Sequence, residues 1–344
     1  MSEDHLSNET SISAELTETG IKAAARSRAI SAFDRLLGGV ADMGNAWLEG
    51  VAIRRRAKNE GERLLIEATA KYGVEKLTSD EEFAKRALEG HFNKLARQQI
   101  NKDAVVAKAL EDLRQQPPSE DEANSGPEMI SEDFSARFER YAEDATTDDL
   151  REKWARVLTA EIKRPNTFSV KVLRVVDELD ASIAALFERV CQHQAGGVLI
   201  KATLGELAFG ETARLVAAEL LVEPGMGQIR IGSEITDNQG KNFWFWAFGA
   251  IAVALSKTEN IPPSDPANLV LTSEQGKPAI PVYVLTEVGR AITAILSDRT
   301  FKTVQGLAIR LTEIAPQSEV RQYMQVAENS WNLIKIVPAR QPAG

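Results

Sequence analysis

The sequence predicts an α+β protein that is mainly α-helical, with an N-terminal helical arm, a helical subdomain and a C-terminal region that contains a small antiparallel sheet. Three observations predict this class. Residues 21–116 are rich in Ala, Leu, Glu, Lys and Arg and contain no proline, which favours long helices. Between residues 133 and 190 apolar side chains recur at helical spacing. From residue 196 onward, short apolar runs are bounded by Gly and Pro, as in strands joined by turns.

The composition is that of a folded chain. The protein has 344 residues, of which 43% are hydrophobic and 26% charged, enough for two or three domains. Its formal net charge of -9 argues against a general phosphate-backbone binder. One cysteine, Cys191, excludes an intramolecular disulfide. Met1–His5 lacks the features of a secretory signal, and the apolar run Phe243–Leu255 is too short for a membrane-spanning helix. We therefore expect a cytoplasmic protein.

The first half of the chain divides by charge and by proline. Residues 1–20 are acidic, contain no Lys or Arg, and predict a disordered tail. Residues 21–116 predict the helical arm. Residues 117–132 begin with two prolines, contain a Gly-Pro pair and carry only negative charges, which predicts an acidic linker between the arm and the rest. Residues 133–195 predict a four-helix subdomain, in which Pro165 ends the second helix.

The second half predicts a mixed domain over residues 196–300. A short helix is expected at 204–209 and a second at 211–221, followed by strands at 229–231, 243–247, 250–255 and 282–285 and a closing helix at 286–296. This order of helix, helix, hairpin and helix resembles a winged helix-turn-helix, and Tyr283–Arg290 looks like its last wing strand running into a helix. Residues 301–344 predict a helix that ends near Ile314, strands at 321–326 and 333–337, and a flexible end.

One segment carries a specific family pattern. A phenylalanine-bearing helix precedes a helix of the form Leu-x-x-x-Trp-x-x-x-Leu-x-x-Glu-Ile, and a Pro-Asn-Thr-Phe-Ser turn follows. This pattern resembles the bacterial family catalogued as domain of unknown function 2806, in which glycine is usual at the position of Asn166. The resemblance covers most of the chain after the predicted linker and, loosely, the basic helix before it. It implies a structural core formed by Phe138, Leu150, Trp154, Leu158, Ile162, Pro165 and Phe168.

The same helical pattern is similar, more weakly, to the Abi-alpha proteins, which are linked to abortive phage infection. The first family is defined by the absence of a known activity, so the resemblance implies a bacterial cytoplasmic protein and raises phage defence as one expectation. It carries no catalytic residue, metal or cofactor.

The arm is basic within an acidic protein. Residues 21–60 hold eight basic residues against four acidic ones, and an apolar stretch precedes Arg54–Arg56. The arm could pair with another helix or with a second copy, lie on an anionic membrane surface, or meet nucleic-acid phosphates. We expect self-association or another protein first, an anionic membrane surface second and nucleic acid third. The candidate contact residues are Phe33, Trp47, Arg54, Arg55, Arg56 and Lys58.

The remaining polar residues predict no catalytic constellation. The helix expected at 211–221 would read DNA in a winged-helix protein, yet Arg214 is its only basic residue, and residues 200–299 hold eight basic against eleven acidic residues. Cys191 and His193 are two positions apart and would not face each other on a helix. We therefore expect a non-enzymatic assembly or adaptor protein without a metal or cofactor. A phage-defence protein at the inner membrane surface and a DNA-binding regulator are the alternatives.

Overall fold

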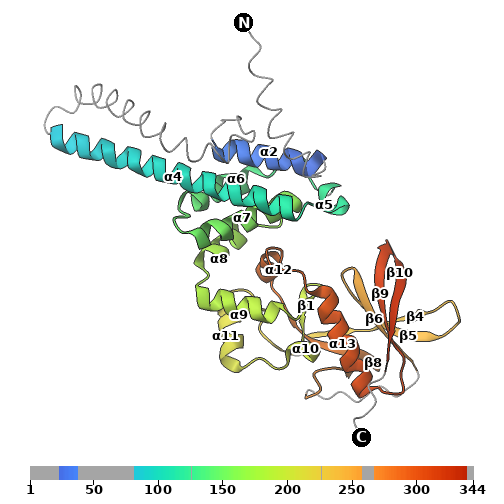
Figure 1. Ribbon diagram of the computed structural model, residues 1–344. Helices are drawn as coiled ribbons and strands as arrows, with labels where there is room; N and C mark the ends of the chain where they lie inside the picture. Colours follow the sequence, from blue (N-terminus) through green and yellow to red (C-terminus); the bar gives the residue numbers. More distant parts are fainter. Residues whose placement is uncertain (1–22, 38–80, 125, 226, 258–266, 339–344) are drawn as a thin grey trace. The chain divides into compact units, whose positions relative to one another are not determined.

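The computed structural model describes residues 23–37, 81–124, 126–225, 227–257 and 267–338 (Figure 1). It consists of two compact units, one ending at Leu173 and one beginning at Arg174. The predicted α+β class with mainly α structure is confirmed. The predicted tail at residues 1–20 lies outside the described residues.

The first unit is a bundle of helices packed around the C-terminal half of one long helix. Leu113 of α4, Phe138 of α6 and Trp154 of α7 are each at most 2% exposed. The Phe138 and Trp154 rings meet edge to face, with centroids 5.9 Å apart, and Tyr141 stacks on Trp154 at 4.6 Å. Such aromatic pairs add to the free energy gained from burial alone. The described helices of this unit are α2 (Ala23–Leu37), α4 (Glu81–Gln115), α5 (Glu120–Asn124), α6 (Glu132–Glu143) and α7 (Asp148–Lys163). The next helix, α8 (Val170–Glu178), begins in the first unit and ends in the second.

Local sequence sets the ends of these helices. The Ser131 side chain accepts a hydrogen bond from the Phe134 N–H at the start of α6, and Thr147 does the same for Leu150 at the start of α7. These caps satisfy N–H groups that have no partner within the helix. α7 ends at Lys163, two residues before Pro165, in agreement with the prediction.

The segment 117–132, for which a linker is predicted, is part of the helical unit. It contains α5, and its Ala123 and Ile130 side chains are buried. The acidic, proline-containing composition predicted a linker and gave no indication that these two apolar side chains are buried. The predicted four-helix subdomain is also divided, because α6 and α7 pack with α4 in the first unit whereas α9 belongs to the second.

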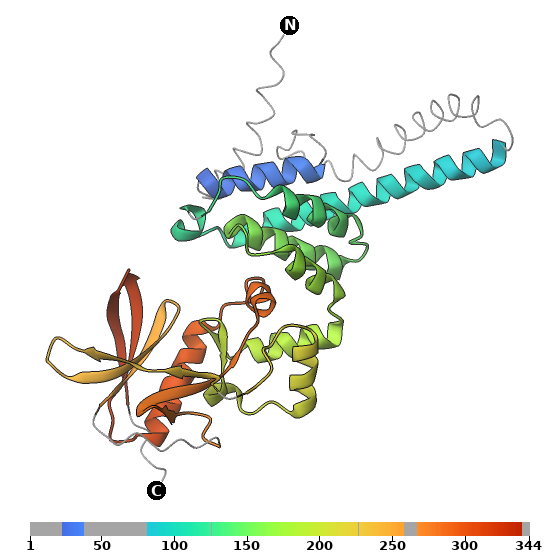
Figure 2. The same cartoon turned by 180° about the vertical axis from the view of Figure 1, so that it is seen from behind.

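The second unit contains two antiparallel sheets with one helix between them. In the first sheet the strand order is β1-β2-β8-β3, and β7 also pairs with β8. In the second the order is β10-β9-β6-β5-β4. α13 packs against strands of both sheets, and Leu307 and Leu311 of this helix join Trp246 and Val253 in one buried core. Figure 2 shows α13 beside the strands from behind.

Most strands and helices predicted for the second unit lie close to their predicted positions. The short strands β1, β4 and β7 were not predicted, and β8 begins five residues before the strand expected at 282–285. The helix expected at 204–209 is displaced. It lies instead at Lys201–Leu204, and Gly205, at a φ of 85°, ends it in a conformation that glycine adopts readily. The strands are β1 (Gln194–Ala195), β2 (Val198–Ile200), β3 (Ile229–Ile231), β4 (Ser233–Thr236), β5 (Asn242–Phe248), β6 (Ile251–Ser256), β7 (Thr272–Glu274), β8 (Lys277–Val284), β9 (Val320–Ala327) and β10 (Ser330–Val337). The helices are α9 (Ala181–Cys191), α10 (Lys201–Leu204), α11 (Phe209–Ala217), α12 (Glu287–Thr293) and α13 (Thr300–Ile314).

Candidate interaction surface

The N-terminal half of α4 extends beyond the helices that pack on its C-terminal half (Figures 1 and 2). α4 has 35 residues, a length of about 52 Å at 1.5 Å per residue. Its buried side chains begin at Asn101, and none of the described side chains between residues 82 and 98 is buried. We call residues 82–98 the overhang.

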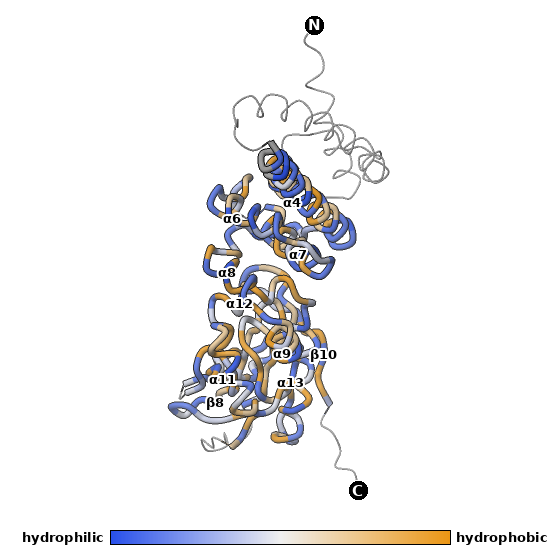
Figure 3. The backbone as a smooth tube through the Cα atoms, turned by 90° about the vertical axis from the view of Figure 1, so that its left-hand side faces the viewer, coloured by the Kyte–Doolittle hydropathy of each residue, from blue (hydrophilic) through white to orange (hydrophobic). Residues whose placement is uncertain are grey.

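An apolar row on the overhang continues the packed face of the same helix. Leu88, Phe92 and Leu95 follow a spacing of four and three residues. The same alternation leads on through Gln99 and Lys102 to Val106, Ala109 and Leu113, of which the last three are buried. This heptad spacing is that of helix-packing seams. Figure 3 shows hydrophobic and hydrophilic residues alternating along α4. The overhang therefore presents a helix-packing seam, with Leu95 47% exposed and Leu88 and Phe92 half-buried.

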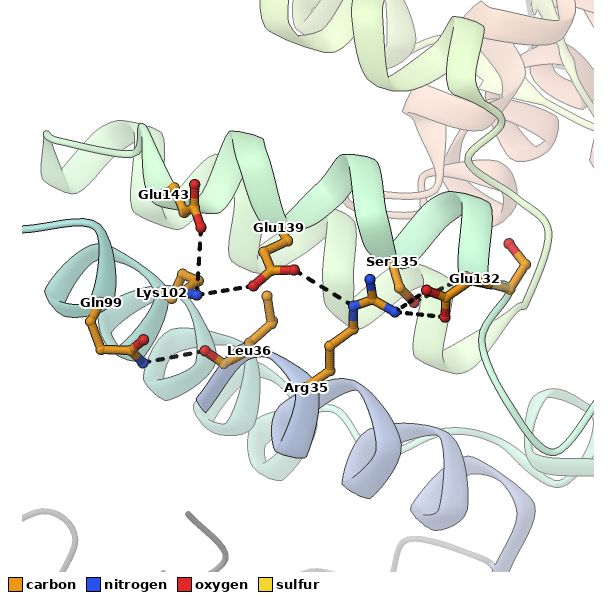
Figure 4. A network of polar contacts seen from close by, with 9 residues as sticks. Arg35, Leu36, Gln99, Lys102, Glu132, Ser135, Glu139 and Glu143 are labelled. Atoms are coloured by element: carbon orange, nitrogen blue, oxygen red, sulfur yellow. Dashed lines mark hydrogen bonds and ion pairs between the residues drawn. The ribbon is translucent and has the colours of Figure 1, made fainter. Parts of the chain in front are cut away.

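A polar row begins at Lys102, within this seam, and runs along one side of it toward the overhang. In the packed half, the Lys102 ammonium lies 3.0 Å from Glu139 and 3.5 Å from Glu143, both on α6 (Figure 4). Gln98 donates a hydrogen bond of 3.1 Å to Glu143. At helical spacing the row continues from Lys102 and Gln98 to Lys94 and His91. Both of these side chains are exposed, and neither has an ion pair among the residues that the structure describes.

The end of α2 is fixed to this part of the unit. Arg35 donates to both carboxylate oxygens of Glu132 at 2.6 Å, and Gln99 donates to the Leu36 carbonyl at 3.3 Å (Figure 4). The hydrogen bond from Arg35 lowers the pKa of Glu132. A cavity of about 10 Å³ lies beside Arg35, which is room for one water and not for an organic ligand. It is lined by Ala32, Arg35, Leu36, Phe134, Ser135, Phe138 and Leu158.

Two buried charged residues, Arg28 and Glu161, hold α2 and the end of α7 in place. Arg28 is fully buried, and its guanidinium donates to the carbonyls of Ile162 at 2.7 Å, Glu122 at 2.9 Å and Pro127 at 3.1 Å. It thereby joins α2 to α5, α7 and the segment predicted as a linker. A buried guanidinium requires such partners because desolvation of a charge is costly.

Glu161 accepts hydrogen bonds from three consecutive backbone N–H groups, those of Asn166, Thr167 and Phe168, at 2.6, 3.1 and 3.0 Å. Its side chain closes the turn that leads from α7 toward α8. The sequence pattern contained Glu161 but gave it no role. The signal that could have found it is an acidic residue on an otherwise apolar helix face, one turn before Pro165.

The structure tests part of the predicted contact set. Phe33 is 1% exposed and packs in the core of the helical unit, so this side chain is not accessible to a partner. The apolar spacing around it was recognised, but α2 buries that face within its own chain. Trp47, Arg54, Arg55, Arg56 and Lys58 lie outside the described residues.

The family-pattern residues form most of a core. Phe138, Trp154, Leu158, Ile162 and Phe168 are at most 2% exposed. Leu150 and Pro165 are half-buried, because Leu150 lies in the first turn of α7 and Pro165 lies in the turn after it.

α11 corresponds to the helix predicted at 211–221, which would read DNA if this region were a winged-helix protein. Arg214 donates a hydrogen bond to Ser182 on α9, and Glu211 forms an ion pair with Arg189 on the same helix. Phe209, the first residue of α11, is 89% exposed. These contacts tie the charged groups of α11 to the neighbouring helix.

Cys191 and His193 lie at the end of α9. Burial raises the pKa of the Cys191 thiol to about 12, and burial lowers the pKa of His193. A thiol with a raised pKa carries little thiolate and is a poor nucleophile. Among the described residues, no group of three or more His, Cys, Asp or Glu side chains is placed to hold a metal ion.

Comparison with known proteins identifies a family for one part of the chain. Residues 85–196 match the family model described as Protein of unknown function (DUF2806). The predicted resemblance to this family is thereby confirmed over residues 85–196. The matched range begins within the overhang and ends after α9, so it is shorter at its C-terminal end than the resemblance implied.

No curated protein and no solved structure shows significant similarity to the chain. The weaker resemblance to Abi-alpha proteins stays a prediction. None of the helices that the structure describes has both the length and the apolar character needed to cross a membrane.

Proposed function

We propose that the protein is a non-enzymatic assembly or adaptor protein of the bacterial cytoplasm that acts through protein–protein contacts of its N-terminal helices. The observation that carries this proposal is the overhang of α4, where the apolar row of Leu88, Phe92 and Leu95 continues the face that the packed half buries. The seam between two packed helices is about one apolar residue wide in each turn, and this row has the same width. A second protein helix on this row would bury it as α6 and α7 bury the packed half.

The alternatives make different demands on the same surface. A phage-defence protein at the inner membrane would need a broad apolar face flanked by basic residues. A winged-helix regulator would need cations on α11 that are available to phosphates. On α11, Arg214 instead donates a hydrogen bond to Ser182, and Glu211 forms an ion pair with Arg189. The order of α9, β2, α10, α11, β3, β8 and α12 supports a winged-helix-like module used for protein contact or for structure.

The test is site-specific photo-crosslinking in bacterial cells. Leu95 is replaced with a benzophenone amino acid in the full chain, and the matched control carries the same residue at Asn93, which is also exposed but lies on another face of α4. We expect a protein adduct from position 95 and none from position 93. Equal adducts at both positions, or no protein adduct from position 95, would overturn the proposal.

A truncation that removes the whole predicted arm is a poor test. Residues up to 116 include Arg28, Val105 and Leu113, which are buried in the helical unit. Their loss would unfold the unit and remove any partner contact for that reason alone.

A further inference from the structure

The packed half of α4 shows what kind of helix fits this seam. α6 places Phe134, Phe138 and Ala142 in the core at four-residue spacing. Beside this apolar row it presents Glu139 and Glu143, again four residues apart, to the polar row of α4. α6 is thus an amphipathic helix with an apolar row and an adjoining carboxylate row.

α6 ends at Glu143, opposite Gln98, while the seam and the polar row of α4 continue onto the overhang. Lys94 lies four residues before Gln98 and eight before Lys102, and His91 lies seven before Gln98, so both continue the polar row onto the overhang. The overhang thus offers an apolar seam and an adjoining polar row for which the described residues supply no carboxylates like Glu139 and Glu143 in the packed half.

We infer that the overhang takes an acidic amphipathic helix of a partner protein, with an apolar row over Leu88, Phe92 and Leu95 and carboxylates at four-residue spacing that face Lys94 and His91. This inference rests on the proposed function and names the chemistry of the partner. Complementary charge beside an apolar seam selects the partner and its register. Neither nucleic-acid phosphates nor lipid headgroups would need the narrow apolar row.

Two labelled helical peptides and the full chain test this inference by fluorescence anisotropy. One designed peptide carries Leu in the apolar row and Glu at four-residue spacing beside it, and the other carries Gln in place of each Glu. The test variant is Lys94→Glu. Its matched control is Arg97→Glu, which makes the same charge change at an exposed position on the opposite face of α4 from Leu88.

We expect the Glu peptide to bind more tightly than the Gln peptide, and Lys94→Glu to weaken the Glu peptide by roughly tenfold, as for loss of one close charge pair. Arg97→Glu should change binding by less than about twofold, since distant exposed charges are screened. A peptide with Lys in place of Glu should recover affinity for the Lys94→Glu protein. Equal effects of the two variants, or no preference for the Glu peptide, would overturn the inference.

The crosslink at position 95 separates this failure from failure of the proposed function. A protein adduct at 95 whose crosslinked segment lacks carboxylates at four-residue spacing leaves the proposed function standing and overturns the acidic-helix inference. Binding of phosphatidylglycerol vesicles that is lost in Lys94→Glu and kept in Arg97→Glu, without binding of the Glu peptide, would overturn it in favour of a lipid surface. A crosslink to a second copy of this chain would overturn the assignment to a different protein.

Discussion

Glu161 is the residue on which the turn after α7 depends. Its carboxylate accepts three backbone N–H groups and also interacts with the charge of Arg28. Burial raises the pKa of this carboxyl, while the three hydrogen bonds and Arg28 act in the opposite direction. A side chain that accepts three hydrogen bonds cannot be replaced by an amide, because the amide nitrogen is a donor and would face N–H groups.

We expect Glu161→Gln to lower the free energy of unfolding by about 1–3 kcal/mol, the usual cost of leaving buried polar groups without partners. Urea unfolding followed by circular dichroism measures this loss. The control is Glu152→Gln on the same helix, where the side chain is half exposed and pairs with Arg156, a type of contact worth about 0.3–0.5 kcal/mol. Equal losses in the two variants would contradict the role given to Glu161.

Asn166 adopts a left-handed backbone conformation, with a φ of 67°. Glycine adopts this conformation without strain and asparagine with little, whereas a Cβ without a local hydrogen-bonding group costs about 1–2 kcal/mol. This backbone requirement is the physical reason that glycine suits the same position in the family pattern.

We therefore expect Asn166→Ala to lower the free energy of unfolding by about 1 kcal/mol, with Asn166→Gly within about 0.5 kcal/mol of the original chain. Both variants keep the backbone N–H that Glu161 binds, so the comparison isolates the conformational cost. Thermal unfolding of the three proteins under one set of conditions provides the measurement. A loss for Asn166→Gly as large as that for Asn166→Ala would show that the side chain, and not the backbone angle, matters.

At the scale of elements, a charged corner joins the turn after β4 to β9. Arg321 contacts Asp237 at 2.8 Å and also pairs with Glu319, and its guanidinium lies 4.3 Å from the centre of the Phe243 ring. Lys241 pairs with Glu319 as well. The largest cause of the lowered pKa of Asp237 is the hydrogen bond that it accepts from the backbone N–H of Lys241. The largest cause of the lowered pKa of Glu319 is the hydrogen bond that it accepts from the Lys241 side chain.

A carboxylate whose pKa is lower in the folded state stabilises the fold above its unfolded pKa, and this contribution is lost as the pH falls through the folded pKa. The ordinary values are 3.8 for Asp237 and 4.5 for Glu319. We expect the urea midpoint of the second unit to fall as the pH drops from about 5 to about 3. In Asp237→Asn this drop should be smaller, whereas Glu274→Gln, at an exposed position, should follow the original chain. A drop unchanged in Asp237→Asn would exclude the charged corner as its cause.

At the scale of the whole molecule, the chain divides into two compact units between Leu173 and Arg174. In the second unit, residues of both sheets and of α13 form one continuous cluster that includes Trp246, Val282 and Leu307. The first unit depends on α4, because Val105, Val106 and Leu113 lie in its core.

We expect a fragment of residues 169–344 to fold on its own, with cooperative thermal unfolding and dispersed amide signals in NMR spectra. A fragment of residues 117–173, which keeps α6 and α7 but lacks α2 and α4, should be unfolded, since a chain of this size needs its complete core. A folded fragment 117–173 would show that α4 is not required for the helical unit.

Most helices and strands could be predicted from the sequence, but few of the contacts between them could. Helix and strand periods identified α7, α13 and the strands β5 and β6 on either side of Gly249, because local spacing and turn residues decide such elements. The role of residues 117–132 was predicted wrongly, because Arg28, which lies 94 and 99 residues earlier in the chain, donates hydrogen bonds to the carbonyls of Glu122 and Pro127. Of the candidate site, the sequence predicted a helical arm that would dock on a partner, but the overhang depends on where α6 ends, which no local sequence pattern shows.

The sequence by itself determined the α+β class, the family segment, the core aromatic residues and the lack of a recognisable catalytic motif, since these follow from composition, period and short motifs. Only the tertiary structure decided that Phe33 is internal, that Arg28 and Glu161 are buried, and that residues 82–98 of α4 extend past their neighbours. The physical reason is that burial of a side chain depends on residues far away in the chain. An apolar row in the sequence predicts that some surface covers it, and the fold decides whether that surface belongs to the same protein.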